Sequence, residues 1–196
     1  MCSSDLFVQI QGTAHRGSFI IPRHSSERRS FLPVGLLDAR TIVADSAFAI
    51  YDAPLWNLAL VASRLHLVWI AAVCGKLKTD YRYSNTLGWN TFPIPTLTDK
   101  NRSDMDSAAA EILLARESYY PATVAELYDS ERLASEFIQL QEAHQRNDEI
   151  VERIYIGRRF KNDTERLEKL FEIYALALKH GAPQETTGAR EGAGRW

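Results

Sequence analysis

Two adjoining stretches decide the fold of this chain: Leu55–Gly75 reads LWNLALVASRLHLVWIAAVCG, and Lys76–Pro95 reads KLKTDYRYSNTLGWNTFPIP. The first stretch is apolar almost throughout. Asp52 stands before it as a credible N-cap, Pro54 falls in the first turn and Gly75 suits a C-terminal cap, so we expect one long buried helix. The second stretch gathers cationic, anionic, amide and aromatic side chains. Surfaces of this composition bind nucleic acid more often than they perform chemistry.

The run from Leu55 to Cys74 is twenty residues long, so a membrane span has to be weighed. Arg64 and His66 stand in its middle half, and an arginine there costs about 2.5 to 3.5 kcal/mol on the insertion scale. We therefore interpret the run as a buried helix of a soluble protein with no membrane partner. No charged-then-apolar leader opens the chain, so secretion is not indicated either.

Composition and charge narrow the class of protein. The chain has 196 residues, 45% hydrophobic and 24% charged, which suits one compact domain and a smaller helical lobe. Cys2 and Cys74 form neither a disulfide framework nor a metal-ligand spacing, so a reducing, cytoplasmic location is expected. The net charge of -2 hides an asymmetry: residues 1–100 carry ten Lys/Arg against seven Asp/Glu, and residues 101–196 carry thirteen against eighteen. The first half is the half that a polyanion would tolerate.

The region before the long helix has the pattern of strands and turns. Short β-rich runs at 7–12, 18–22 and 31–37 are separated by glycines and prolines, and a further run covers 41–51. After the polar stretch, Phe92–Pro95 cannot be helical, because each proline removes a donor and holds its predecessor in extended geometry. It is expected to form a rigid exit from the first lobe.

The remainder of the chain follows helical spacing. Ser103 and Asp106 have capping-box spacing at the start of a first helix. A third helix follows Asp163 and stops at Gly181. Between them, a second helix carries an apolar seam with two polar members: Leu133, Phe137, Leu140, His144, Asn147, Val151 and Ile154. Three helices of this kind predict a small bundle.

These patterns predict an α+β fold. A first lobe of short strands and a long buried helix covers residues 1–98, a small three-helix C-terminal domain covers 99–181, and a flexible tail covers 182–196. Cofactor turns, phosphate loops, zinc-protease motifs, nucleophile elbows and CxxC pairs are all absent. Asn90–Pro93 differs in order from the Asn-Pro-Pro-aromatic tetrad of amino-group methyltransferases. The chain alone is therefore expected to carry no catalytic residue, no metal and no cofactor.

An ordered string of motifs resembles one known family. The motifs are Ser63-x-x-His66-x-x-Trp69, Gly75-Lys-Leu-Lys-x-Asp-x-Arg-Tyr-Ser84, Trp89-Asn-x-Phe-Pro-x-Pro95, Leu127-Tyr-Asp129, Ala143-His-Gln-x-Asn-Asp148 and Arg166-Leu-x-x-Leu-Phe-x-x-Tyr174. Over residues 27–180 the chain resembles the closing part of the target-recognition domain, and the helical C-terminal domain, of MmeI-type enzymes. Trp89, Ile94 and Leu133 depart from the residues that are usual in that family.

MmeI-type enzymes are single-chain type II restriction-modification proteins that join a nuclease, an adenine methyltransferase, a recognition domain and a helical C-terminal domain. The resemblance implies that the first lobe is the C-terminal part of a target-recognition domain. It also implies partners, namely double-stranded DNA and upstream methyltransferase and nuclease domains that are missing here. The parent would use S-adenosylmethionine to methylate an adenine flipped out of the duplex.

The resemblance singles out Lys78 and Asp80. In the family, the matching positions form a charge pair that varies with the base at one end of the recognised site. Lysine can donate to the acceptors of guanine and aspartate can accept from the amine of cytosine, so this pair suits a G·C base pair. The alternative is a solvated, salt-linked turn.

Further candidate contacts surround that pair. Lys76, Arg82 and Arg28 could each bind a phosphate or a base, or could equally be exposed cations. Ser84 and Asn85 have donors and acceptors for bases, but they also suit an ordinary turn.

Other polar residues favour structural roles. Tyr81 and Tyr83 alternate with Arg82, so at least one of them should pack in the core. His66 is expected to be a hydrogen-bonded core histidine, and His144 with Asn147 a buried polar pair that fixes helix register.

Two other interpretations stay open: a helical module whose seam binds a partner protein, and a truncated product without function. Alanine at Lys78 and Asp80 would separate DNA recognition from the first of these.

Overall fold

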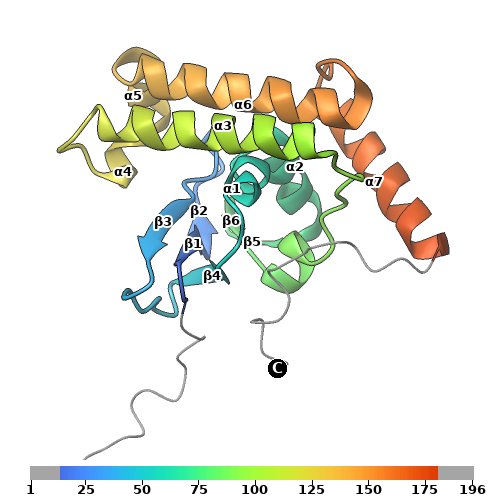
Figure 1. The fold of residues 1–196 in the computed structure, drawn as a ribbon, viewed down its shortest axis with the longest axis horizontal. Coiled ribbons are helices and arrows are strands. Elements are labelled where there is room, and N and C mark those ends of the chain that lie inside the picture. The colour runs from blue at the N-terminus through green and yellow to red at the C-terminus, as the bar shows by residue number, and fades with distance from the viewer. Residues whose placement is uncertain (1–13, 181–196) are drawn as a thin grey trace, which may run out of the picture.

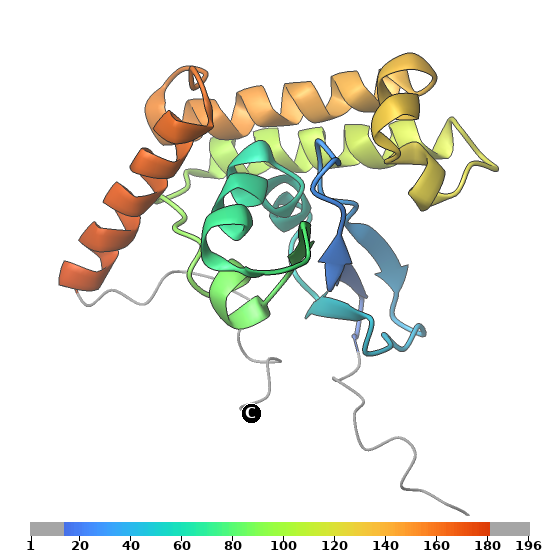
Figure 2. The same cartoon turned by 180° about the vertical axis from the view of Figure 1, so that it is seen from behind.

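The computed structural model describes residues 14–180 of the 196-residue chain, and Figure 1 shows the ribbon. Two three-stranded antiparallel sheets and a set of helices make up this part, which confirms the α+β class. The strands and helices up to residue 98 are here called the N-terminal part, and the helices after it the C-terminal part. The N-terminal part lies beneath two long helices of the C-terminal part (Figures 1 and 2). The expected strand at 7–12, the helix stop at Gly181 and the expected tail fall outside the described residues.

The first sheet has β1 (Gly17–Pro22) in its centre, between β3 (Gly35–Asp38) and β4 (Ala47–Tyr51). The strand predicted at 18–22 is confirmed, whereas the runs at 31–37 and 41–51 are strands only towards their ends. Asp52 is not the predicted helix cap. Its backbone has φ of 52°, and its carboxylate accepts from the N–H groups of His15 at 2.9 Å and Arg16 at 2.6 Å, so it closes the loop before β1 instead.

The second sheet is made of β2 (His24–Ser25), β6 (Asp80–Arg82) and β5 (Gly75–Leu77), in the order β2-β6-β5. Gly75 therefore opens a strand, and the predicted helix cap at this position is wrong. The C-cap is Cys74, whose N–H donates to Ile70 O at 3.0 Å. The helix thus passes into β5 within two residues.

The predicted single long helix is two helices, α1 (Trp56–Val61) and α2 (Arg64–Val73). The break lies at Ser63, which has extended geometry, donates through Oγ to Leu60 O at 2.6 Å and accepts from His66 N at 3.3 Å. Serine offers the backbone this alternative to continued helix. The six residues of α1 are all buried, so the prediction of a buried segment is confirmed. None of the helices at 14–180 combines the length and apolarity that crossing a bilayer requires.

A turn of π-helix, η2 (Asn85–Trp89), follows β6, and Phe92–Pro95 is non-helical as predicted. The C-terminal part then starts with α3 (Asp99–Glu117), which is capped by Thr98 through a 3.1 Å bond from Asn101 N. The capping box predicted at Ser103 and Asp106 is therefore wrong. Thr98 comes three residues after Pro95, which ends the extended segment, and threonine is a favoured N-cap residue, so the helix begins there.

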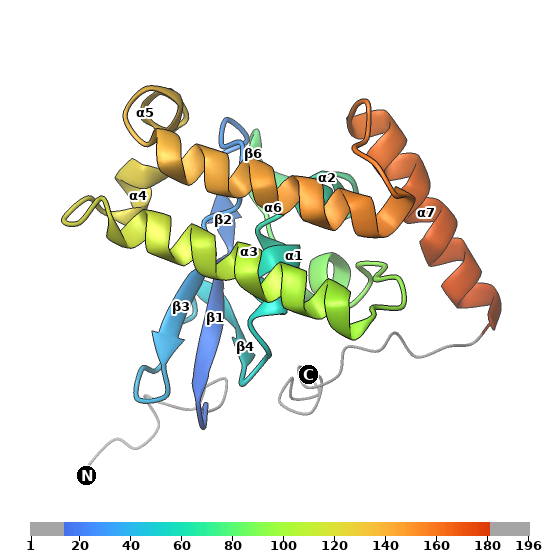
Figure 3. The same cartoon turned by 45° about the horizontal axis from the view of Figure 1, so that its top comes forward.

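Helices α4 (Val124–Leu127) and α5 (Ser130–Ser135) connect α3 to α6 (Ile138–Ile156). The apolar seam predicted for a single second helix is shared by α5 and α6, with buried Phe137 between them. Helix α6 runs antiparallel to α3, as Figure 3 shows, and Arg146 Nε donates to Glu111 Oε2 between them at 2.8 Å. The helix after Asp163 is confirmed as α7 (Asp163–His180).

The helices of the C-terminal part pack on the N-terminal part as well as on one another. Helix α7 lies along α2, where the Trp69 ring is 5.1 Å from Phe171 and 5.6 Å from Tyr174. Helix α1 packs under α3, and a single apolar core runs through both parts of the chain. The helical sequence buries its apolar stripes against the N-terminal part as well as against itself, because α1 and α2 offer apolar surface of their own.

Candidate nucleic-acid interface

Residues Gly75–Arg82 form a β-hairpin, here called the recognition hairpin, with Lys78 and Thr79 as its two turn residues. Lys78 has φ of 58°, in the left-handed region, and Thr79 does not. Positive φ at the first turn position alone is the pattern of a type II′ turn, which matches the twist of two antiparallel strands and usually has glycine at that position. The chain therefore holds a lysine at a strained position on an exposed tip, an arrangement that is common at functional sites.

The strand register gives the second sheet one open face. Residues directly opposite in antiparallel strands share a face, and neighbours along a strand alternate. Arg82 pairs with His24, and Asp80 pairs with Leu77. These four residues therefore lie on one face, on which His24, Leu77 and Arg82 are exposed and Asp80 is half-buried. We call His24, Leu77, Asp80 and Arg82 the open face, with Lys78 at its tip.

The opposite face of this sheet packs on α2. Ser25 is buried, Tyr81 is half-buried, and Tyr83, which follows β6, is 4% exposed. The Tyr83 hydroxyl lies 3.1 Å from Nε2 of His66, which is fully buried and whose pKa burial lowers to about 3. The predicted packing of the tyrosines and the predicted core role of His66 are both confirmed. A rigid base of aromatic side chains thus supports the open face.

Asp80 connects the hairpin to the loop that carries Arg28. Its Oδ1 atom accepts from the backbone N–H of Glu27 at 3.4 Å, while exposed Arg28 follows directly. Lys76 Nζ lies 3.9 Å from Glu27 Oε2 and 5.7 Å from the centre of the Tyr81 ring. Between residues 14 and 180, no ion pair joins Lys78 to Asp80, so the turn is not salt-linked. Lys78, Asp80 and Arg82 thus lie on the open face or at its tip, whereas Lys76, which pairs with Tyr81, lies on the opposite face of the same hairpin. Arg28 lies in the loop that Asp80 contacts through Glu27.

Ser84 and Asn85 use their side chains in the following turn. Ser84 Oγ caps η2 by accepting from Leu87 N at 3.4 Å and lies 2.9 Å from the Thr86 hydroxyl. Asn85 Oδ1 accepts from Thr86 N at 3.0 Å. The turn role that their sequence allowed is therefore present, and fewer of their polar atoms remain for a ligand.

His24 was missed as a candidate contact. It belongs to a strand of two residues, with no local pattern that marks it. Only its pairing with Arg82 places it on the open face. Pairing between distant strands cannot be predicted from local sequence, so no local signal marks His24 as a contact.

The polar pair of the C-terminal part is structural, as predicted. His144 Nε2 lies 2.7 Å from the Tyr128 hydroxyl, and its ring stacks on Phe31 with centroids 4.3 Å apart. Asn147 Nδ2 donates to Ala59 O at 2.9 Å. Burial lowers the pKa of His144 well below its ordinary value, so the ring is neutral. The described residues contain no cluster of His, Cys, Asp and Glu that could hold a metal ion.

Comparison with known proteins decides the family. A family model described as MmeI, target recognition domain, matches residues 3–96, and a model described as MmeI, C-terminal domain, matches residues 97–179. The chain belongs to the MmeI family. It is 44% identical over 157 residues to a protein named DNA methyltransferase A from Bacillus subtilis (strain 168), an overlap of 80% of this chain and 17% of that protein.

A solved structure of the Type IIL restriction-modification enzyme MmeI in complex with DNA has the same fold. The match has a TM-score of 0.80 at 32% sequence identity and covers 86% of this chain and 22% of that chain. The chain therefore spans about a fifth of the length of its MmeI-family relatives.

Proposed function

We propose that this chain reads the sequence of double-stranded DNA on behalf of a restriction-modification adenine methyltransferase. The observation that carries the proposal is the open face. It belongs to a hairpin with a two-residue turn, presents cations and a carboxylate to solvent, and is supported on the opposite face by buried aromatic side chains. Sequence readout requires such donors and acceptors to be held rigidly against base edges. The MmeI target-recognition match and the DNA complex of the relative support the same conclusion.

Each candidate residue takes a role that suits its chemistry. Lys78 would donate to guanine acceptors in the major groove, and the free lone pairs of Asp80 would accept from the amine of cytosine. Arg82 has the two-pronged donor geometry that fits guanine or a phosphate. Lys76 and Arg28 flank them and would bind phosphates, which fixes the register on the duplex. Ser84 and Asn85 would add contacts only through atoms that the turn leaves free.

Methyl transfer would belong to upstream domains that this chain does not include. S-adenosylmethionine would supply the methyl group there. We propose no site for that cofactor in the cavity between α2 and α7, because its charged residues, Arg64 and Asp163, bind each other. We propose that this chain only positions the duplex. Its partners would be DNA and those methyltransferase and nuclease domains.

Two further assignments complete the proposal. Residues 1–98 would be the end of the target-recognition domain, and residues 99–181 the helical C-terminal domain. The location would be cytoplasmic, where DNA is accessible and where Cys74, a buried free thiol, stays reduced.

The alternative of a helical docking module loses its main support. Leu140, Val151 and the other central seam residues are buried within this chain and are not available to a partner. DNA recognition is therefore the function that we propose.

Binding to a randomised duplex pool tests the proposal. The chain should enrich particular sequences, with an affinity that falls as salt rises, because phosphate contacts release counterions. Lys78→Ala and Asp80→Ala should each change the enriched sequence at one position. Absence of both enrichment and salt dependence would refute DNA recognition.

A further inference from the structure

Helix α2 joins the recognition hairpin to the C-terminal part. Its last residue, Val73, is followed through Cys74 by β5. Its first residue, Arg64, binds α6 and α7. A rigid helix transmits a change of tilt from one end to the other. The contacts of Arg64 therefore bear on where the hairpin points.

The backbone of α2 is capped by a carboxylate from a distant helix. Asp148, in α6, accepts through Oδ1 from the N–H of Arg64 at 2.7 Å and is 7% exposed. The first N–H groups of a helix have no partner inside it, so an oxygen acceptor there satisfies one of them. Asp148 thus adds a second cap to the one that Ser63 provides.

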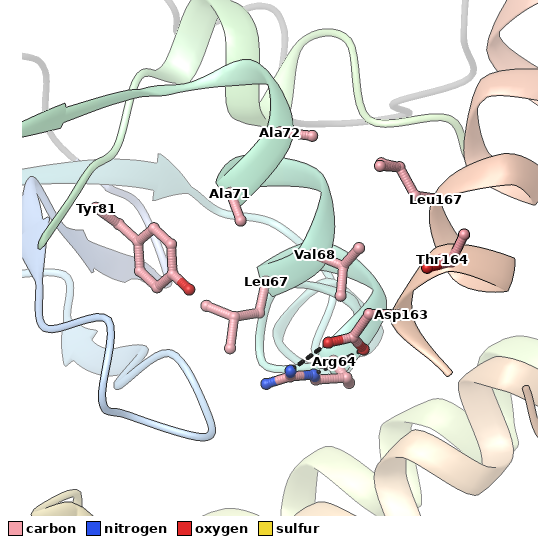
Figure 4. Close-up of a pocket in the computed structure, with 9 residues that line it drawn as sticks. All are labelled: Arg64, Leu67, Val68, Ala71, Ala72, Tyr81, Asp163, Thr164 and Leu167. Carbon is pink, nitrogen blue, oxygen red and sulfur yellow. Dashed lines mark hydrogen bonds and ion pairs between the residues drawn. The ribbon is translucent and has the colours of Figure 1, made fainter. Parts of the chain in front are cut away.

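The side chain of Arg64 extends this junction. Nε donates to Asp163 Oδ1 at 3.1 Å and Nη2 donates to Oδ2 at 2.5 Å, which makes two parallel bonds. Figure 4 shows this pair. Asp163 also accepts from Arg166 Nη1 at 2.9 Å, and Arg166 Nε donates to Glu152 at 2.7 Å. Glu152 is 1% exposed and accepts from Phe160 N at 3.0 Å. We call Arg64, Asp148, Glu152, Asp163 and Arg166 the junction cluster.

The junction cluster is a connected network with one member from the N-terminal part. Arg64 comes from α2, and the other four residues come from α6 and α7. The two arginines are matched by Glu152 and Asp163, which bind them directly. Networks whose groups are all bonded hold one geometry firmly, and they lose it when one partner is removed. Removal of Arg64 would detach α2 from this network.

Apolar packing between α2 and α7 is incomplete beside the Arg64–Asp163 pair. A cavity of about 330 Å³ lies there, with the Arg64–Asp163 pair on its wall (Figure 4). The lining residues, apart from that pair, are Leu67, Val68, Ala71, Ala72, Tyr81, Thr164 and Leu167. Protein interiors resist movement because they are close-packed, so this gap leaves more of the contact on the α7 side of α2 to the Arg64–Asp163 pair. The rings of Trp69, Phe171 and Tyr174 supply the other contact on that side, while the buried face of α2 stays on the core.

We propose that Arg64 and Asp163 are positioning residues for sequence recognition. They fix the tilt of α2, and through α2 the direction in which Lys78, Asp80 and Arg82 are presented. Neither residue touches DNA in this scheme. The inference rests on the proposed function, since it concerns the accuracy of the same recognition hairpin.

One experiment measures geometry without DNA. Amide residual dipolar couplings of the full chain, labelled with ¹⁵N, report the orientation of the recognition hairpin relative to α3 and α6. Arg64→Gln should change the couplings of Gly75–Arg82 while those of α3 and α6 still fit the structure. The matched control is Arg158→Gln, which removes the 2.6 Å pair with Glu165 and leaves α2 untouched. Unchanged hairpin couplings in Arg64→Gln would overturn the proposal.

A second experiment measures recognition. The probes are the duplex that the wild-type chain enriches from a random pool and a scrambled duplex of equal composition. Arg64→Gln should lower the preference between them about tenfold, within the range that a misplaced base contact costs. Affinity for the scrambled duplex should stay the same, because the cations of the hairpin remain. Arg64→Lys keeps the charge but cannot form the two parallel bonds, so it should give an intermediate preference. This variant replaces Arg64→Gln if the glutamine variant does not fold.

The outcomes separate this inference from the proposed function. If the wild-type chain enriches no sequence, the proposed function is refuted. The dipolar couplings then still test whether Arg64 fixes the orientation of the hairpin. If Lys78→Ala loses the preference while Arg64→Gln and Arg64→Lys both keep it, DNA reading stands and the positioning role is refuted.

Discussion

The Nε2 atom of His66 lies 3.1 Å from the hydroxyl oxygen of Tyr83, and this buried contact joins α2 to the residue that follows β6. Both side chains are neutral, because burial lowers the pKa of His66 to about 3 and raises that of Tyr83 well above its ordinary value. The hydrogen bond fixes the end of the recognition hairpin on α2. The junction cluster therefore holds the start of α2, and the His66–Tyr83 bond holds the end of the recognition hairpin that follows α2.

Tyr83→Phe removes this hydrogen bond and leaves His66 Nε2 without a partner. A buried polar atom left unsatisfied costs about 1 to 3 kcal/mol, so the free energy of unfolding should fall by that amount in urea titrations. The control is Tyr51→Phe, because the Tyr51 hydroxyl is buried without a hydrogen-bond partner among the described residues. That change should be neutral or stabilising. Equal losses in the two variants would mean that the His66 contact contributes nothing specific.

Lys78→Gly separates the structural cost of the hairpin tip from its function. Lys78 has φ of 58°, which glycine adopts without strain, so unfolding free energy should stay equal or rise by up to about 1 kcal/mol. Loss of the ammonium group should weaken the preference for the enriched duplex by about 1 to 3 kcal/mol. Urea titration and competition binding measure the two effects. Lys78→Ala is the control, with the same loss of preference and no gain in stability; a glycine variant that retains the preference would contradict the assigned role.

Asp148→Asn should make stability less dependent on pH. Burial raises the pKa of Asp148 to about 7, with the nearby Glu152 charge adding to the shift and the Arg64 N–H, Arg166 and Arg64 charges opposing it. A carboxyl with a raised folded-state pKa contributes most below its unfolded pKa, and that contribution is lost as pH rises towards 7. Asparagine can still accept from the Arg64 N–H and carries no charge to bury. The variant should therefore gain stability relative to wild type between about pH 4 and 7.

Unfolding titrations across that pH range measure the difference, and above pH 7 the gain should level off at about 1 kcal/mol or more. His66 has the opposite dependence in both proteins, because its lowered pKa makes stability fall as pH drops below 6.5. The comparison with wild type cancels that effect. A difference that does not change with pH would show that Asp148 is ionised throughout.

Local sequence patterns predicted the elements whose signals are local. The strand at 18–22, the extended Phe92–Pro95 segment and the helix after Asp163 follow from alternation, prolines and helical spacing. The buried roles of His66 and Tyr83 also followed, since each lies on an apolar face. The family resemblance singled out Lys78 and Asp80 but did not predict the hairpin that carries them. In the structure Lys78 is exposed and Asp80 is half-buried.

The sequence did not predict features that depend on distant partners. The break at Ser63 is stabilised by Asp148, which lies in a helix 84 positions from Arg64. Asp52 looked like a helix cap, yet its carboxylate binds the backbone before β1. Helix α7 packs on α2 because Trp69 offers an aromatic surface to Phe171 and Tyr174, which helical spacing alone cannot reveal.

His24→Ala tests the polar residue that the structure adds to the open face. His24 is exposed opposite Arg82, so its imidazole would reach the same groove and could donate to or accept from a base edge. Affinity for the enriched duplex should fall about fivefold, the loss expected for one modest base contact, while affinity for a scrambled duplex should change little.

The control for His24→Ala is Arg40→Ala, because the Arg40 side chain is 93% exposed and follows a strand of the first sheet. Loss of this charge should affect both duplexes equally if at all. Anisotropy titrations at one pH measure both variants, and wild-type affinity in His24→Ala would place the DNA away from β2 and confine the interface to the hairpin.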